Sequence, residues 1–125
     1  ERGISISTSS VFYDRSTERI LISTWFEIED TANGVSATGA YLEYDLSDEK
    51  LQLDKSVTLL KDTDSGIMRC RAESVAFSRE ANSLELRGDA AVYWDGDEYG
   101  AEVIRVDLNT DSITLEGRIR GNING

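Results

Sequence analysis

Four stretches of this chain align on one another without a gap, and this repeat constrains the fold more than any other feature of the sequence. The copies begin at Val11, Leu42, Val75 and Ile104, about 30 residues apart. A period of this size is typical of proteins built from stacked supersecondary units. The aligned segments are VFYDRSTERILI, LEYDLSDEKLQL, VAFSREANSLEL and IRVDLNTDSITL.

Alternate positions of every copy are apolar, although only 39% of the residues in the chain are hydrophobic. Alternation with a period of two indicates strands that have one dry face. The four apolar columns within the aligned segments are Val11, Leu42, Val75 and Ile104; Tyr13, Tyr44, Phe77 and Val106; Ile20, Leu51, Leu84 and Ile113; Ile22, Leu53, Leu86 and Leu115. The same face continues through Phe26, Val57, Ala90 and Ile119, and then through Ile28, Leu59, Val92 and Gly121.

Turn-forming residues interrupt each copy in the middle, at RSTER, LSDEK, REANS and LNTDS. A second turn signal follows each of the first three copies, at Asn33-Gly34, Ser65-Gly66 and Asp95-Gly96. Each copy therefore predicts a strand, a tight turn and a longer strand. An Asp that ends the first strand, as in Tyr44-Asp45, is expected to accept hydrogen bonds from the turn backbone.

One column does not fit the apolar pattern, because it contains Thr24, Lys55, Gly88 and Gly117. Small residues there predict either extra room or a bend in the inner face. Lys55 either reaches the rim, which we expect, or marks a place where the interior opens to water. Phe12, Leu21 and Trp25 are apolar on the face that is polar in later copies, which predicts that something covers the outside of the first copy.

Composition excludes several classes of function. The net charge of −11 disfavours nucleic acid as a partner, because such proteins bind phosphates through clustered Lys and Arg. The sequence predicts one domain over residues 1–125, with no apolar run long enough to span a bilayer. The first residue is not Met but Glu1, which is typical of a processed or trimmed chain, and any export signal or membrane anchor would have preceded it. The single Cys70 cannot form an internal disulfide, and a buried free thiol is expected.

The sequence contains few residues that could perform catalysis or bind a metal. It contains no His, which excludes Ser–His and Cys–His catalysis and most zinc sites. The densest acidic cluster is Asp95, Asp97 and Glu98, which is too short for a calcium loop and which we interpret as an acidic turn. There is also no glycine-rich phosphate loop. We therefore expect neither an enzyme nor a metal or other cofactor.

The copies that read AYLEYDLSDEKLQLDKSVTL, AESVAFSREANSLELRGDAAV and AEVIRVDLNTDSITLEGRIRG resemble the periplasmic lipopolysaccharide-export family, the OstA-like proteins of the LptA and LptC type. The resemblance covers essentially the whole chain. Its motif is a strand ending in Tyr-Asp, a short turn, and a Leu-x-Leu-x-Gly strand, which appears here as Leu84–Gly88. The first two copies depart from it, with Thr24 and Lys55 in place of Gly.

The resemblance implies a β-jellyroll or β-taco, in which two antiparallel sheets face each other across an apolar groove. It implies a periplasmic, non-enzymatic module that binds the acyl chains of lipopolysaccharide or a related glycolipid, and edge strands that join other OstA-like domains head to tail. Whether the chain is a bridge or a membrane-anchored adaptor stays open. The candidate groove residues are Phe26, Leu53, Val57, Leu59, Leu86, Ala90, Val92 and Ile119.

Two alternatives remain at this point. The repeat is equally compatible with a structural or adhesive β-solenoid whose closed core takes part in assembly. A carbohydrate-active enzyme on a β-helix would have to use the acidic cluster at Asp95, the only one that could support it. Binding of apolar ligands to the folded protein would distinguish the lipid module from the closed solenoid.

Overall fold

The computed structural model describes residues 3–123, which form strands and turns and contain no helix. Antiparallel pairing joins the twelve strands of this range into one continuous sheet. The predicted class, an all-β chain of antiparallel strands, is confirmed. Within the same range, no helix has the length and apolar character that crossing a membrane requires.

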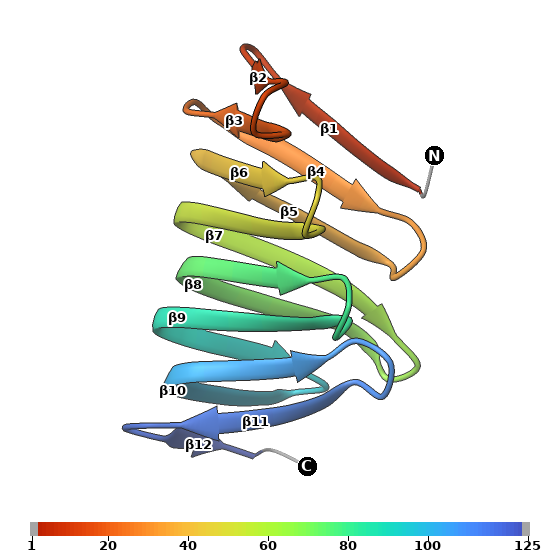
Figure 1. The fold of residues 1–125 in the computed structure, drawn as a ribbon. Coiled ribbons are helices and arrows are strands. Elements are labelled where there is room, and N and C mark those ends of the chain that lie inside the picture. Colours follow the sequence, from red (N-terminus) through yellow and green to blue (C-terminus); the bar gives the residue numbers. More distant parts are fainter. Residues whose placement is uncertain (1–2, 124–125) are drawn as a thin grey trace.

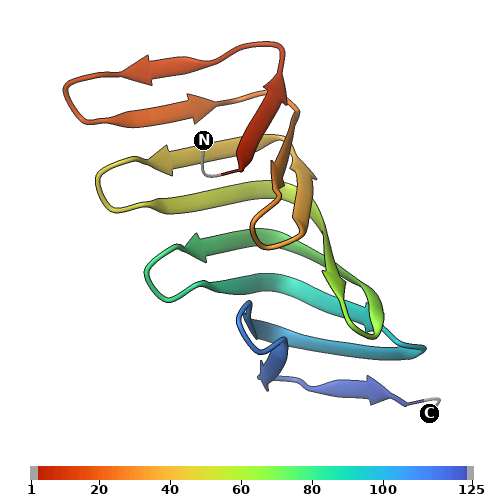
Figure 2. The same cartoon turned by 90° about the vertical axis from the view of Figure 1, so that its right-hand side faces the viewer.

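The four central strands are long, and each bends near its middle, so that the sheet folds over on itself (Figure 1). These strands are β7 (Lys50–Thr63), β8 (Gly66–Ser78), β9 (Ser83–Trp94) and β10 (Asp97–Asp107). Each long strand therefore belongs to both halves of the folded sheet. The turned view in Figure 2 shows the long strands β7 to β10 stacked in chain order toward the C-terminal end.

We call the two halves leaf A and leaf B. Leaf A contains the segments 57–63, 66–72, 90–94 and 97–101 of the long strands, and leaf B contains 50–54, 74–78, 83–87 and 103–107. The short strands of leaf A are β1 (Ile4–Thr8), β4 (Phe26–Asp30), β5 (Val35–Gly39) and β12 (Arg120–Asn122). The short strands of leaf B are β2 (Phe12–Asp14), β3 (Arg19–Ile22), β6 (Tyr41–Asp45) and β11 (Ser112–Glu116).

The sheet folds along a row of β-bulges. The pairing of β7 with β8 shifts register between Asp54 and Val57, and the β8–β9 and β9–β10 pairings shift at the corresponding places. The bulges place two successive residues in the left-handed region, at Lys55-Ser56, Gly88-Asp89 and Gly117-Arg118. Such residues bend a strand and turn its side chains. The column that broke the apolar pattern is therefore the corner between the leaves, as the small residues predicted.

The turns opposite the corner form in the way the sequence indicates. Asp45 Oδ1 accepts hydrogen bonds from the Ser47 backbone N–H at 3.0 Å and from the Ser47 hydroxyl at 2.8 Å. These bonds favour the carboxylate, with the Ser47 side chain contributing most, and lower the pKa of Asp45. Asp107 accepts the Asn109 N–H at 2.8 Å in the last copy. An acidic residue before each of these turns therefore satisfies turn backbone rather than performing chemistry.

The apolar columns pack between the leaves, and most of their members are buried. Leu42, Val75 and Ile104 are at most 1% exposed. The prediction is wrong for Val11 and Tyr13, which are 55% and 48% exposed because, among residues 3–123, β2 pairs with β3 alone and its other edge is uncovered.

Ile119 is also wrongly placed by the pattern. It is 58% exposed, since it lies between β11 and β12 at the last rung, where no further strand covers the sheet. Lys55 is exposed on the outside of the corner, as expected of a rim residue.

Gly88 provides a test of the corner. Its φ is +85°, and a Cβ added there would lie 2.8 Å from Glu73 Cβ. We expect Gly88→Ala to lower the free energy of unfolding by about 1–3 kcal/mol, because it adds both strain and a clash. Gly121→Ala is the control, because its Cβ would meet nothing within 4 Å and its φ is not left-handed. Urea unfolding should separate the two variants, and equal stabilities would contradict a strained corner.

Candidate groove between the leaves

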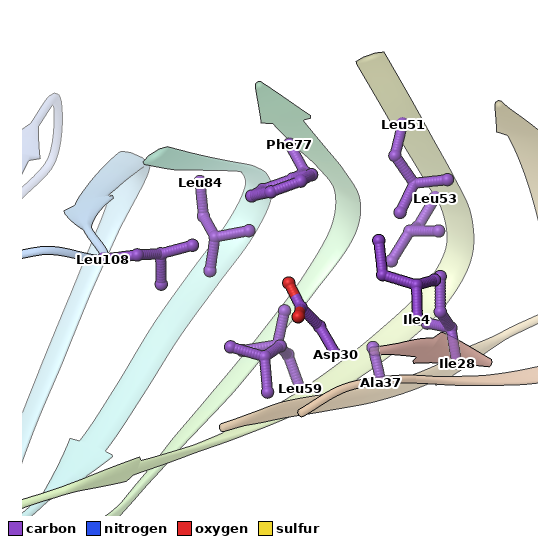
Figure 3. A pocket seen from close by; sticks show the side chains of 11 residues that line it. Ile4, Ile28, Asp30, Ala37, Leu51, Leu53, Leu59, Phe77, Leu84 and Leu108 are labelled. Atoms are coloured by element: carbon purple, nitrogen blue, oxygen red, sulfur yellow. The ribbon is translucent and has the colours of Figure 1, made fainter. Parts of the chain in front are cut away.

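The candidate site is the space between the inner faces of the two leaves. A cavity of about 40 Å³ lies there (Figure 3), and apolar side chains from both leaves surround it. Leaf A provides Leu59 and Ile28, and leaf B provides Leu53 and Phe77. The remaining lining residues are Ile4, Asp30, Val35, Ala37, Leu51, Leu84 and Leu108.

The inner face of leaf A has three rows of side chains that run parallel to the corner. They follow one another from the corner to the open side. Phe26, Val57 and Ala90 form the row beside the corner, and each is at most 1% exposed. Ile28, Leu59 and Val92 form the middle row. The row nearest the open side contains Asp30, Lys61 and Trp94, each two residues further along its strand.

The structure distributes the eight predicted groove residues unevenly. Leu53 and Leu59 line the cavity. Phe26, Val57, Leu86, Ala90 and Val92 are buried in the tightly packed core beside it, and Ile119 lies outside on the surface. The cavity is therefore closer to the open side than to the corner. Lipid contact at these residues stays a prediction.

The cavity is too small for a lipid chain as it stands. A cavity of about 150 Å³ is known to hold one benzene molecule, and this one has about a quarter of that volume. An acyl chain therefore requires the two leaves to separate. The corner is held by continuous strands, so the side that can open is the opposite one, where the turns of the two leaves meet.

Polar side chains join the turns across this open side, and we call this set of contacts the lip contacts. Asn82 in the β8–β9 turn of leaf B donates to Asn33 Oδ1 in the β4–β5 turn of leaf A at 3.3 Å. Asn82 also donates to Asn109 Oδ1 at 2.7 Å, which ties two turns of leaf B together. Lys61 Nζ of leaf A lies 2.8 Å from Asp111 Oδ1 of leaf B.

Lys61 and Asp30 are inner-face residues that the sequence analysis missed. Both are buried, at 6% and 9% exposure, among apolar neighbours. Asp30 accepts hydrogen bonds from the Ala32 N–H at 3.1 Å and from the Asn33 side-chain amide at 2.8 Å. The repeat pattern could have identified both residues as inward-facing. Lys61 stands two residues after the inward-facing Leu59, and Asp30 stands two residues after the inward-facing Ile28. The inward-facing columns of the repeat therefore extend one position further than the apolar residues do.

The acidic turn at Asp95 shows no sign of a metal centre. Within residues 3–123, no three acidic or cysteine side chains come together in a way that would hold a metal ion. Tyr99 donates its hydroxyl to Asp97 Oδ2 at 3.1 Å. Asp95 and Gly96 form the tight turn between β9 and β10, as the sequence indicated.

A folded antiparallel sheet with bulges along the fold and an apolar interior defines the β-jellyroll, or β-taco, class. The chain is similar to the crystal structure of LptH, the LptA-homologous periplasmic component of the conserved lipopolysaccharide transport device from Pseudomonas aeruginosa. The TM-score is 0.87 at 14% sequence identity, and the match covers 98% of this chain and 95% of that chain. The predicted LptA-like fold is thereby confirmed.

No family model and no curated protein matches the sequence. The likeness to LptH therefore lies in the three-dimensional arrangement and not in residue identity.

Cys70 provides a chemical test of how tightly the leaves are closed. Cys70 lies on the inner face of leaf A, where it is the register partner of Leu59 on the neighbouring strand. Burial raises the pKa of its thiol to about 12. We expect the folded protein to resist alkylation by iodoacetamide at pH 8, because the thiolate is the reactive form. Urea should make the reaction fast. Mass spectrometry follows the adduct, and rapid labelling of the folded protein would contradict a closed interior.

Proposed function

We propose that this chain is a periplasmic, non-enzymatic module that carries lipopolysaccharide or a related glycolipid, with acyl chains between its leaves. The observation that carries the proposal is the apolar cavity enclosed by both leaves, in a fold shared with LptH. An apolar interior in a sheet that is closed on one side only is suited to a lipid chain once the two leaves separate. Passage of a ligand through such a groove needs no catalytic group.

The small size of the cavity favours one alternative, a structural module whose core stays closed. The two functions differ in a single physical property, which is whether the leaves separate enough to admit a chain. Ligand contact with the inner face therefore distinguishes them.

Photocrosslinking tests the groove directly. A diazirine analogue of leucine placed at Leu59 faces the cavity, whereas the same analogue at Leu60 faces outward from leaf A. We expect crosslinks to lipopolysaccharide from position 59 and not from position 60, because successive side chains of a strand point to opposite faces. Mass-shifted bands on denaturing gels report the adduct.

Leu59 and Leu60 form a matched pair, since the two variants differ only in the face of the strand that carries the reactive group. Crosslinking from neither position, with circular dichroism showing a folded protein, would favour the closed structural module. Equal crosslinking from both would indicate nonspecific adsorption of lipid.

We also propose that the two ends of the folded sheet join other OstA-like domains head to tail. At the N-terminal end, Val11 and Tyr13 are exposed members of the inner apolar columns, and Phe12 and Trp25 are 59% and 54% exposed on the outer face. The expected cover on the outside of the first copy is therefore absent within residues 3–123. A rung from a second molecule, added beside β2, would cover the open edge at Val11 and Tyr13, and edge strands accept such additions readily.

Val11→Asp tests this assembly. We expect it to weaken self-association roughly tenfold, because it places a charge in the column that a partner rung would cover. Ile67→Asp is the control, because Ile67 is equally exposed, at 57%, but lies at the β7–β8 turn away from both ends. Sedimentation velocity over a range of concentrations measures the association. Equal behaviour of the two variants, or a monomer at every concentration, would contradict head-to-tail stacking.

A further inference from the structure

Lys61 is the only buried cation among residues 3–123, and it lies in the row nearest the open side, which also contains the buried carboxylate of Asp30. Its strand neighbours on the inner face are Val35 on one side and Met68, which is fully buried, on the other. An apolar residue at this position would continue the inner row without any desolvation cost. A buried ammonium is costly unless it is paired, so its partner determines the stability of this part of the structure.

The partner of Lys61 belongs to the opposite leaf. Asp111 stands in the β10–β11 turn of leaf B, where its Oδ1 lies 2.8 Å from Lys61 Nζ. That oxygen is itself buried, yet it accepts no well-directed hydrogen bond from any residue in the described range. The pair is therefore held by charge more than by hydrogen-bond geometry. Lys61 Nζ also donates to the Asp62 carbonyl at 3.3 Å, within its own strand.

Separation of the leaves breaks this pair. Lys61 remains on leaf A beside the groove, while Asp111 moves away with the turn of leaf B. Asp111 is partly exposed, with 27% of its side chain accessible, so water can solvate it once it is free. Lys61 is buried between Val35 and Met68 and keeps the Asp62 carbonyl, which carries no charge to replace that of Asp111. The energetic cost of opening therefore falls mainly on Lys61.

We propose that Lys61 selects lipids that carry an anionic group next to their acyl chain, by exchanging Asp111 for that group when the leaves open. The inference rests on the proposed lipid groove. A phosphate or carboxylate at the head of the chain would lie at the mouth of the groove while the chain enters the cavity beyond it. Such a ligand supplies a new partner for the ammonium, whereas a neutral lipid leaves it unpaired.

The proposal explains how a chain with a net charge of −11 recognises an anion. The surface as a whole repels one, but screening by salt limits that repulsion. One cation in an environment of low polarity interacts more strongly than several in water. Selectivity therefore needs only this one residue.

Two amphiphiles of equal chain length test the exchange. Dodecyl phosphate and dodecyl glucoside, both below their micelle concentrations, are titrated into the folded full chain and followed by calorimetry. We expect the wild type to bind the phosphate roughly tenfold more tightly, as one charge-assisted hydrogen bond predicts. Lys61→Met should abolish this preference, Lys61→Arg should retain most of it, and inorganic phosphate alone should not compete.

Lys50→Met is the matched control, because Lys50 lies at the other end of the same strand and is exposed. It should keep the wild-type preference. Asp111→Asn leaves Lys61 intact but removes its internal partner, and Asn tolerates the left-handed φ of +61° at this position. This variant should bind dodecyl phosphate several-fold more tightly than the wild type.

The outcomes separate the two proposals. An undiminished preference for the phosphate in Lys61→Met, or unchanged phosphate affinity in Asp111→Asn, would overturn the role of Lys61 while the groove itself stands. Competition by inorganic phosphate would also overturn it, since an anion without a chain does not open the leaves. If neither amphiphile bound the folded wild type, the lipid groove would fail, and the inference with it.

Discussion

The structure depends on burying one apolar face of a single sheet. A flat sheet of this length would leave that face in water, and folding the sheet along the bulges places the face against itself. The left-handed pairs at Lys55-Ser56, Gly88-Asp89 and Gly117-Arg118 permit this, because each turns a strand without breaking its pairing on either side. Packing, groove and lip contacts all follow from that fold.

A consequence of this construction is that the interior has one closed side and one side that can open. At the corner, continuous strands join the leaves covalently. At the lip, the leaves meet through side chains, with Asn82 donating to Asn33 and Lys61 paired with Asp111. Side-chain contacts can be exchanged for contacts with a ligand, whereas strand continuity cannot. The lip contacts are therefore the ones that have to break if the leaves separate.

The ends of the stack also leave part of the apolar inner face uncovered. Val11, Tyr13 and Ile119 belong to the repeating pattern, yet they are exposed, because a terminal rung has a neighbour on one side only. These residues occupy core positions of the repeat that no neighbouring rung covers, so they are not exceptions to the pattern. They make the ends of the folded sheet apolar and suited to pairing with further rungs.

Most of the fold was determined by the sequence alone, since alternation and turn signals recur in four copies and each copy confirms the others. Leu42, Val75 and Ile104 could be assigned to the core because local strand geometry fixes which face a side chain occupies. What only the tertiary structure decided is which residues meet across the two leaves. Lys61 and Asp111 are far apart in the chain, and no local pattern pairs them. The closed state of the groove, the polar lip and the exposed ends arise from the folding of one leaf onto the other, which depends on the whole sheet at once.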